Sequence, residues 1–302
     1  MKKRTLIVTA FCMIVSICFV VTGCSKTSGI NLQGTIVSNN PVGDEMGADS
    51  IIMLDLSTGE IVKIADTKNA REPRFSAEGD KVLCKHIGEF LKTSIREYNH
   101  VTGESTIMFE PGKYDEGIRN FYNAKYVPNS DNISFYSGES IYLYDIKTGE
   151  PEKIVDRGNA GYFWYSDGDN LLIDSDNMTI CKVNIKTKEE HVLITEGMGA
   201  VLSANDRYIC YIKVNYLKVD EKWVMESSLN VRDMETGEEW ECEKKNTLGY
   251  VFSPDSNYIA IVQEGKTQDV QEMIVWDYRN DKKQVVMEKI NFRHIDFFDW
   301  KQ

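Results

Sequence analysis

Basic residues, prolines and histidines are scarce in this chain of 302 residues. Lys and Arg number 35 against 47 Asp and Glu, which gives a formal net charge of −12. A surface with this charge repels the phosphate backbone of a nucleic acid, so we expect no nucleic acid partner. Only 6 prolines accompany a hydrophobic content of 42%, which excludes a proline-rich disordered chain and indicates a globular one.

Common catalytic motifs are also missing. The sequence has no Gly-x-Ser-x-Gly, His-Glu-x-x-His or phosphate-loop pattern. The 4 histidines fall in separate parts of the chain without the spacing of metal ligands: His86, His100, His191 and His294. The acidic segment 174–177 lacks the glycine and the distal glutamate of a calcium loop, so we interpret it as a turn between two strands. We therefore expect no cofactor and no metal site.

The first 24 residues have the features of an export signal. Three cationic residues at positions 2–4 precede an apolar run from Leu6 to Val21, which is shorter than the roughly 20 residues of a membrane-spanning helix. The tetrad 21–24, Val-Thr-Gly-Cys, resembles the bacterial lipobox, in which the cysteine carries a diacylglyceryl group and becomes the first mature residue. We predict a signal peptide over 1–23, lipid attachment at Cys24 and a lipidated tether over 24–34. An uncleaved signal anchor and a plain secretory peptide are the alternatives.

This start predicts a lipid-anchored protein on the cell membrane that faces away from the cytoplasm, in an extracellular or periplasmic compartment. Removal of residues 1–23 lowers the net charge by three, from −12 to −15. Anionic headgroups repel such a domain, so we expect the membrane contact to be made by the lipid anchor. Four other cysteines lie in apolar strand-like runs, where we expect buried free thiols, although an exported protein permits one disulfide. They are Cys84, Cys181, Cys210 and Cys242.

Two short signatures alternate along the remaining chain. The first is an apolar strand end followed by a polar tight turn, as in Phe252-Ser-Pro-Asp-Ser-Asn257, and it also begins at residues 75, 126, 164 and 202. The second is a hairpin of the type Leu54-Asp-Leu-Ser-Thr-Gly-Glu60, with further copies at 98–104, 144–150, 183–189, 232–238 and 276–281. Each copy has an Asp or Asn near its start, which we interpret as a cap of the turn rather than a catalytic group. These six are Asp55, Asn99, Asp145, Asn184, Asp233 and Asp277.

The spacing of the hairpin signature predicts an all-β propeller. The six positions that align with Gly59 are 44, 46, 39, 49 and 44 residues apart, which suits one four-stranded antiparallel blade per repeat. The chain begins without a first tight turn and ends with a strand around 294–300 that has no blade behind it. We therefore expect residues 35–302 to form six blades, with the C-terminal strand innermost in a blade that the N-terminal strands complete. Such a join leaves no open sheet edge.

These signatures resemble the repeats of the TolB-type six-bladed β-propellers, which carry a Ser-Pro-Asp-Gly motif. Residues 252–256 keep Ser-Pro-Asp, and the related turns extend the resemblance over essentially all of the mature chain. The resemblance implies the six-bladed fold. We expect no counterpart of the helical N-terminal domain of TolB proper.

One face of such a ring should carry the tight turns, and the opposite face should carry the long connections, where binding sites are common. These connections are 40–50, 85–95, 111–123, 213–228 and 264–272. Candidate binding residues at the channel mouth on this face are Arg71, Arg74, Asn123, Tyr162, Tyr250, His294 and Asp296. They mix polar and aromatic character, although they could also simply fill a hydrated channel. Tyr216 and Trp223 in the longest connection are either contact aromatics or residues folded back over the blade.

Two functions from different classes fit this sequence. The first is a membrane-tethered, non-enzymatic scaffold that binds a protein, peptide or glycan through its long-loop face. The alternative is a metal-dependent, lactonase-like hydrolase that holds its metal in the channel with side chains such as Asn123 and Asp296, which requires at least three converging oxygen ligands. A third possibility is the regulatory propeller of a serine peptidase, which would need a separate partner chain.

Overall fold

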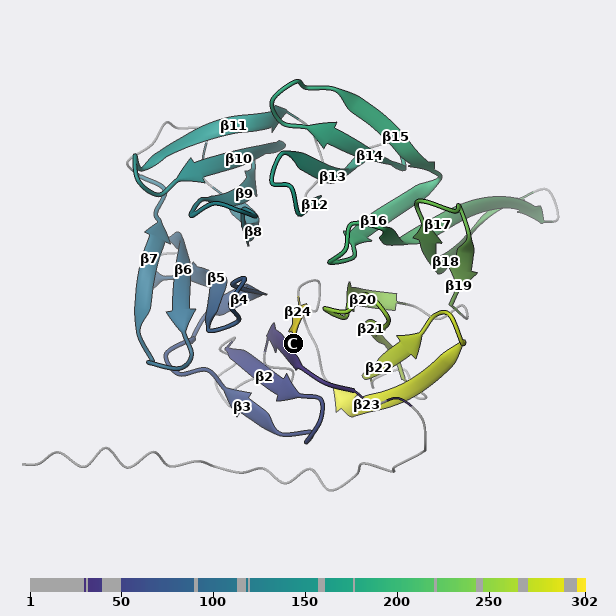
Figure 1. The fold of residues 1–302 in the computed structure, drawn as a ribbon, viewed down its shortest axis with the longest axis horizontal. Helices are drawn as coiled ribbons and strands as arrows, with labels where there is room; N and C mark the ends of the chain where they lie inside the picture. Colours follow the sequence, from purple (N-terminus) through teal and green to yellow (C-terminus); the bar gives the residue numbers. More distant parts are fainter. Residues whose placement is uncertain are drawn as a thin grey trace, which may run out of the picture.

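Six β-sheets arranged in a ring make up the computed structural model of this protein (Figure 1). The structure describes residues 30, 32–39, 50–89, 92–112, 118, 120–156, 161–175, 177–219, 222–242, 247–265, 271–290 and 298–302. Every described sheet has four antiparallel strands, and no helix occurs among these residues. The prediction of an all-β, six-bladed propeller is confirmed.

The blades are numbered here in chain order, with strands given from the centre of the ring outwards. Blade 1 contains β24 (Phe298–Lys301), β1 (Thr35–Asn39), β2 (Ile51–Asp55) and β3 (Ile61–Lys63). Blade 2 contains β4 (Ala70–Phe75), β5 (Lys81–Ile87), β6 (Thr93–Asn99) and β7 (Ser105–Phe109). Blade 3 contains β8 (Phe121–Tyr126), β9 (Ile133–Ser137), β10 (Ser140–Asp145) and β11 (Glu150–Asp156).

The second half of the ring repeats this order. Blade 4 contains β12 (Tyr162–Trp164), β13 (Asn170–Ser175), β14 (Thr179–Asn184) and β15 (Glu190–Thr195). Blade 5 contains β16 (Gly197–Leu202), β17 (Tyr208–Val219), β18 (Lys222–Asp233) and β19 (Glu239–Glu241). Blade 6 contains β20 (Thr247–Phe252), β21 (Ile259–Glu264), β22 (Gln271–Asp277) and β23 (Lys282–Ile290).

The two ends of the chain close the ring in blade 1, as the sequence predicts. Strand β24 pairs with β1 in the register Trp300↔Ile36, so the C-terminal strand is innermost. The indole Nε1 of Trp300 donates to the carbonyl of Gln33 at 3.1 Å. Trp300 is buried in one apolar cluster with Leu32 of the N-terminal segment and Val251 of blade 6. Burial of this tryptophan thus joins the first and last parts of the chain.

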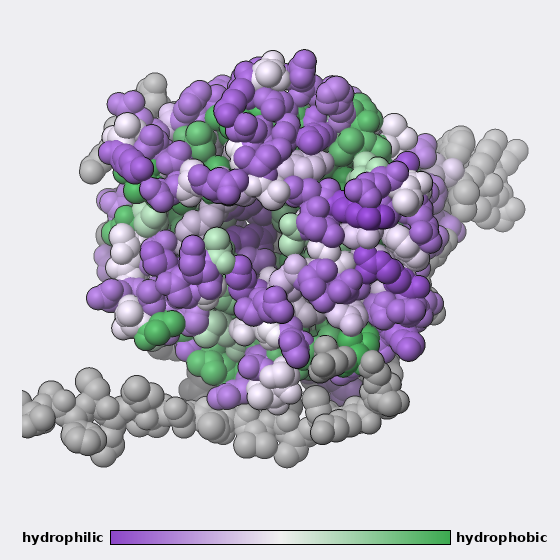
Figure 2. Space-filling model, viewed as in Figure 1, coloured by the Kyte–Doolittle hydropathy of each residue, from purple (hydrophilic) through white to green (hydrophobic). Residues whose placement is uncertain are grey.

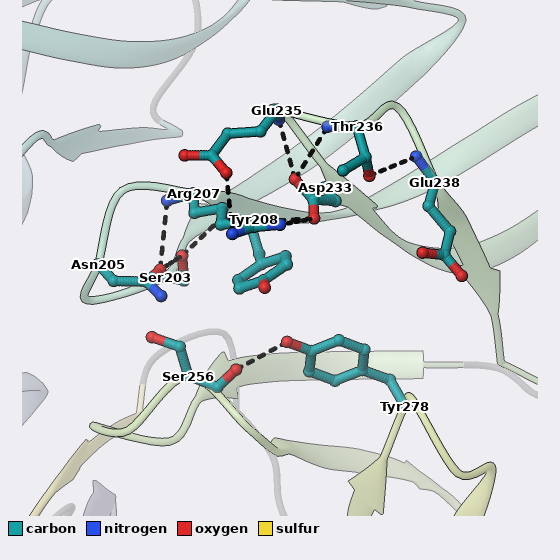
Figure 3. A network of polar contacts seen from close by, with 10 residues as sticks. All are labelled: Ser203, Asn205, Arg207, Tyr208, Asp233, Glu235, Thr236, Glu238, Ser256 and Tyr278. Carbon is teal, nitrogen blue, oxygen red and sulfur yellow. Dashed lines mark hydrogen bonds and ion pairs between the residues drawn. The ribbon is translucent and has the colours of Figure 1, made fainter.

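The turns between third and fourth strands, called outer turns here, are held by the six predicted Asx residues. Asp55 Oδ1 accepts the amides of residues 57 and 58 at 2.8 and 2.9 Å, and Asn99, Asp145, Asn184 and Asp233 do the same in their turns. Asp277 accepts the amide of residue 280 at 3.2 Å. In blade 5, Arg207 also donates to Asp233 at 2.6 Å, and this bond is the main reason that the pKa of Asp233 is lowered (Figure 3). The prediction of structural caps is confirmed.

The turns between first and second strands, called inner turns, correspond to the other signature. In the copies at 203 and 253 the serine hydroxyl accepts the main-chain amide five residues further on, at 2.8 and 2.9 Å. Each of the five turns has a residue with positive φ, which an Asn, Asp or Gly adopts at little cost. These residues are Gly79, Asn129, Gly168, Asp206 and Ser256. The left-handed residue fixes the direction in which the second strand leaves the centre of the ring.

Neighbouring blades pack through apolar side chains from their facing sheets. Between blades 2 and 3, the ring of Phe109 lies 4.7 Å from that of Phe135 and 5.7 Å from that of Phe121, measured between centroids. All three rings are fully buried. Aromatic contacts of this kind hold adjacent sheets at a fixed angle and make the ring a rigid scaffold.

One predicted connection is instead regular structure. Residues 213–228 were expected to form an irregular loop, but β17 and β18 pair over 12 residues each, from Tyr208↔Asp233 to Val219↔Lys222. The hairpin extends beyond the ring at the right of Figure 1. The loop prediction is wrong because this segment is rich in β-branched and aromatic residues, which favour paired strands.

The prediction on cysteine is confirmed, whereas the predicted turn over 174–177 differs because its first two residues belong to β13. Cys84, Cys181, Cys210 and Cys242 are buried free thiols. Asp174 and Ser175 end β13, and the chain turns there into β14. Within the described ranges there is no helix of the length and apolarity that a membrane span requires. The signal peptide and Cys24 lie outside these ranges.

Candidate functional site

The centre of the ring is lined by one equivalent position from each innermost strand. In blades 2 to 6 this position lies two residues before the inner turn, and in blade 1 the register of β24 with β1 places Asp299 at the equivalent point. The six residues at this level, the channel ring, are Arg74, Lys125, Phe163, Val201, Val251 and Asp299. The ring is therefore charged on one side, over blades 1 to 3, and apolar on the other, over blades 4 to 6.

A cavity of about 280 Å³ occupies this channel. All six blades contribute to its wall: Arg74, Asn123, Gly161, Phe163, Gly199–Val201, Leu248–Val251, Phe298 and Asp299. In Figure 2 the centre of the ring is hollowed and surrounded mainly by hydrophilic residues. Because every lining residue except Gly161 belongs to a strand, the side chains of the wall are held in place by the sheets.

Arg74 is the central cation of the cavity wall. Its guanidinium donates to the carbonyl of Phe298 at 2.7 Å and to Oδ1 of Asn123 at 3.4 Å. Burial lowers the pKa of Arg74, while the negative charge of Asp299 opposes this shift. Arginine stays protonated under these conditions, so the guanidinium keeps a full charge inside the channel.

Lys125 is a second cation at the same level. Its residue is 6% exposed, and Nζ lies 3.7 Å from the ring centroid of Phe163 and 5.6 Å from that of Tyr162. Burial, followed by the charge of Arg74, holds the pKa of Lys125 well below its usual value. The charge of Arg74 disfavours a metal cation on this side of the channel in the same way that it disfavours the charged form of Lys125.

Three innermost strands share a β-bulge with a left-handed residue just outside the channel ring. The residues are Glu72, Asn123 and Gly199, with φ of 58°, 55° and 68°. Each of their amides donates to a polar side chain: Asn39 Oδ1 at 3.3 Å, Glu72 Oε2 at 2.5 Å and Asp174 Oδ2 at 2.6 Å, respectively. Each acceptor belongs to the preceding blade, so the bulges of three blades are fixed by their neighbours.

Two of these acceptors, Glu72 of blade 2 and Asp174 of blade 4, are buried acids, and they differ in whether a cation lies nearby. Glu72 faces Lys85, whose Nζ is 4.0 Å from Oε1, and both side chains are 9% exposed. Burial raises the pKa of Glu72 and lowers that of Lys85, while their mutual attraction opposes both shifts. Asp174 accepts two amides, from residues 199 and 200, but has no such cation, and burial raises its pKa to about 6. Asp174 therefore titrates close to neutral pH.

Gly199 and Tyr250 complete the wall on the side of blades 5 and 6. The hydroxyl of Tyr250 donates to the carbonyl of Gly199. A Cβ on Gly199 would lie 2.6 Å from that hydroxyl and would also need a left-handed backbone. Only glycine allows the two strands to approach this closely.

The predicted mouth residues are divided by the structure. Arg74, Asn123 and Tyr250 line the cavity, whereas Arg71 does not. Tyr162 is fully buried and does not line the cavity, and its hydroxyl donates to the carbonyl of Asn123 at 2.8 Å. His294 and Asp296 lie outside the described residues, as does the side chain of Trp223. Tyr216 is 52% exposed on β17, with its hydroxyl 3.6 Å from Sδ of Met178.

Sequence reasoning missed four charged residues at the channel: Glu72, Lys125, Asp174 and Asp299. A signal for two of them was present in the repeats. Aligned on the inner turn, the position of Arg74 corresponds to Lys125 in blade 3 and to Asp299 in blade 1. Among the described residues, no three His, Cys, Asp or Glu side chains are grouped so that they could hold a metal ion.

Comparisons with known proteins concern the fold. No protein-family model and no curated protein sequence matches the chain. Among solved structures, TolB from Acinetobacter baumannii matches with a TM-score of 0.70 at 12% identity, over 90% of this chain and 67% of that one. A protein assigned as TolB from Agrobacterium tumefaciens has a TM-score of 0.56 at 12% identity, over 91% of this chain and 100% of its own.

A third match, assigned as a 6-phosphogluconolactonase from Bacteroides fragilis, has a TM-score of 0.51 at 13% identity, over 91% of this chain and 100% of its own. At these identities the likeness is one of fold and assigns neither an activity nor a ligand. The chain is a six-bladed β-propeller similar in architecture to the TolB structures.

Proposed function

We propose that this protein is a cell-envelope lipoprotein whose propeller is a non-enzymatic binding scaffold. In this proposal, a diacylglyceryl group on Cys24 anchors the chain to a membrane, and the propeller faces away from the cytoplasm. The lipobox-like tetrad and the cationic start of the sequence support the anchor. The likeness to TolB structures supports a propeller of this architecture.

The observation that carries the binding role is the composition of the central cavity. Strands from all six blades converge on about 280 Å³, with the charged residues Arg74 and Asp299 and several apolar groups in the wall. A rigid, largely preformed pocket with a few convergent polar groups is the usual form of a ligand site. We place the binding of a protein, peptide or glycan group at this mouth, around Arg74, Asn123 and Tyr250. The predicted residues Arg71, Tyr162, His294 and Asp296 belong to the same proposal.

The hydrolase alternative would place a metal among the same groups. It needs at least three converging oxygen ligands, one of them Asn123. The carboxamide oxygen of Asn123 already accepts a hydrogen bond from Arg74 at 3.4 Å, and Lys125 adds a second nearby cation. These positive charges favour an anionic group over a metal ion in the channel. We therefore retain the scaffold as the function that the geometry supports best.

The anchor is tested by metabolic labelling with a palmitate analogue in a bacterial host. We expect the wild type to incorporate the label and to fractionate with membranes, and Cys24→Ser to do neither. Cys18→Ser, which removes a cysteine within the signal segment, is the matched control and should behave as the wild type. Equal labelling of Cys24→Ser would exclude lipidation at this position.

The binding role is tested by native mass spectrometry of the full-length protein, with and without chelator, and by crosslinking in intact cells. A scaffold should show a chelator-independent mass and a reproducible crosslinked partner that Arg74→Gln weakens. Arg279→Gln, on the exposed outer turn of blade 6, is a control that should leave crosslinking unchanged. A stoichiometric metal together with turnover of lactones or esters would reject the scaffold in favour of the hydrolase.

A further inference from the structure

Lys125 is a buried cation without a counter-charge in contact with it. Within the described residues, its ammonium has no hydrogen-bond or ion-pair partner and meets only the faces of Phe163 and Tyr162, at 3.7 and 5.6 Å. A cation–π contact compensates only part of the cost of removing an ammonium from water. An anion next to this amine would offset that cost and favour the charged form of Lys125, and the described residues supply no such partner in contact with it.

The amine of Lys125 adjoins the wall of the channel through its contact with Phe163. The other five residues of the channel ring all line the cavity of about 280 Å³, and Lys125 occupies the equivalent place on β8, opposite Ser134 of β9. Its contact residue Phe163 is itself part of the cavity wall. The missing anion would therefore enter through the channel and not from the outer surface.

The acids near this position are already engaged. Both oxygens of the Asp299 carboxylate accept main-chain amides, at 2.9 and 3.0 Å. Glu72 accepts the amide of Asn123 and faces Lys85. Neither carboxylate is bonded to Lys125, because both hold main-chain amides and Glu72 also faces Lys85.

The apolar part of the wall determines the chemical character and size of the remainder of the ligand. Phe163, Val201 and Val251 line the apolar part of the cavity, and Phe163 is the residue that contacts Lys125. An engineered cavity of about 150 Å³ binds benzene, so about 280 Å³ admits a ring or branched chain together with a small head group. The complement of this surface is a molecule with one anionic end and a compact apolar body.

We propose that the channel binds a carboxylate with a compact apolar body, its head between Lys125 and Arg74 and its body against Phe163 and Val251. This inference rests on the proposed binding role of the channel and names the chemical group that it recognises. The carboxylate comes either from a free acid or from the C-terminus of a peptide, since both present the same atoms.

The test is calorimetric titration of the full-length protein in nonionic detergent with 3-phenylpropionate and with its uncharged amide. We expect the acid to bind and the amide to bind at least about tenfold more weakly, because the amide cannot make charge-assisted bonds. Lys125→Met should weaken binding of the acid by about ten- to a hundredfold. The matched control is Lys182→Met, which removes a lysine that lies 4.3 Å over the ring of Tyr165 outside the channel and should not change the affinity.

Near-UV circular dichroism establishes that each variant is folded, and Lys125→Gln replaces Lys125→Met if the latter is not. Equal affinity for acid and amide, full affinity in the folded Lys125 variant, or no binding of acetate, isovalerate and 3-phenylpropionate would each overturn the proposal. To identify the source of the carboxylate, a tripeptide that ends in phenylalanine is compared with its C-terminally amidated form and with N-acetylphenylalanine. If the tripeptide binds more tightly than both, the source is the C-terminus of a peptide. The reverse order between the two acids identifies a free acid.

The two proposals fail in different ways. If carboxylates bind but no partner is crosslinked in cells, the site stands and the scaffold role is lost. The other outcome is that a partner is crosslinked while Lys125→Met changes neither its crosslinking nor the binding of the acid. In that case the scaffold role stands and the carboxylate site is rejected.

Discussion

The buried carboxyl of Asp174 should make the stability of the propeller fall as pH rises from about 4 to about 6. Burial raises its pKa from 3.8 to about 6, with the amides of residues 199 and 200 opposing this shift. The folded state therefore binds a proton more tightly than the unfolded chain. This contribution to stability is fully present below pH 3.8 and is lost as pH rises through about 6.

The magnitude follows from the two pKa values. A difference of about two units, at 1.36 kcal/mol per unit, corresponds to about 3 kcal/mol in the free energy of unfolding. Asp174→Asn cannot titrate and leaves a fixed offset, because one of its side-chain atoms becomes a donor facing a main-chain amide. The test therefore uses the difference in unfolding free energy between wild type and variant, and asks how this difference changes with pH.

The assay is urea denaturation of both proteins at intervals between pH 3.5 and pH 7.5, with the slope against urea checked for equality. The difference in unfolding free energy should decline by about 3 kcal/mol across this range. Asp55→Asn is a control of opposite sign, because the hydroxyl of Ser57 lowers the pKa of Asp55. A flat or rising difference for Asp174→Asn would refute the argument that burial outweighs the two amide bonds at this site.

Three further predictions concern the channel and the closure of the ring. In thermal unfolding, Gly199→Ala should destabilise the protein by about 2 kcal/mol more than the control Gly103→Ala. Both glycines have a left-handed backbone, but only at position 199 does the new Cβ meet Tyr250, at 2.6 Å. Equal losses of stability in the two variants would contradict this. Lys125→Met should raise the free energy of unfolding of the ligand-free protein by about 1 kcal/mol or more in urea, since it replaces an unpaired buried cation by an apolar group, and a loss would show that the cation is compensated. Deletion of residues 298–302 should abolish cooperative unfolding measured by calorimetry. It removes β24 together with the buried side chains of Phe298 and Trp300, which are worth about 3–5 kcal/mol each. Deletion of Gln302 alone, the control, should have no effect.

Much of the fold was predictable because its repeats are built from local chemistry. The Asx residue of each outer turn bonds amides two or three positions away, so the residue type and the turn occur together in the sequence, as at Asp55 and Asp145. The same holds for the inner turns at Ser203 and Ser253. Counting these signatures gives six blades and leaves an unpaired strand at the end. The hairpin of β17 and β18 was mistaken for a loop, although its alternating β-branched and aromatic residues indicated strands.

The site was predictable only in part. Arg74, Asn123 and Tyr250 were placed at the channel from their position at the start of inner strands, and they line the cavity. Lys125 and Asp174 were missed, because a lysine or aspartate in a strand ordinarily lies on a solvated face. Their burial depends on contacts with the next blade, which the sequence of one repeat does not contain.

By itself, the sequence determined the number of blades, the turn chemistry and the pairing of the chain ends, since each depends on residues a few positions apart or on the count of repeats. Only the tertiary structure decided which side chains meet in the channel. Arg74 is 49 positions from Asn123 and 224 from Phe298, and Lys125 is 38 positions from Phe163. Closure of the ring buries Lys125 without an acid bonded to it, and the packing of blade 4 on blade 5 buries Asp174 and raises its pKa.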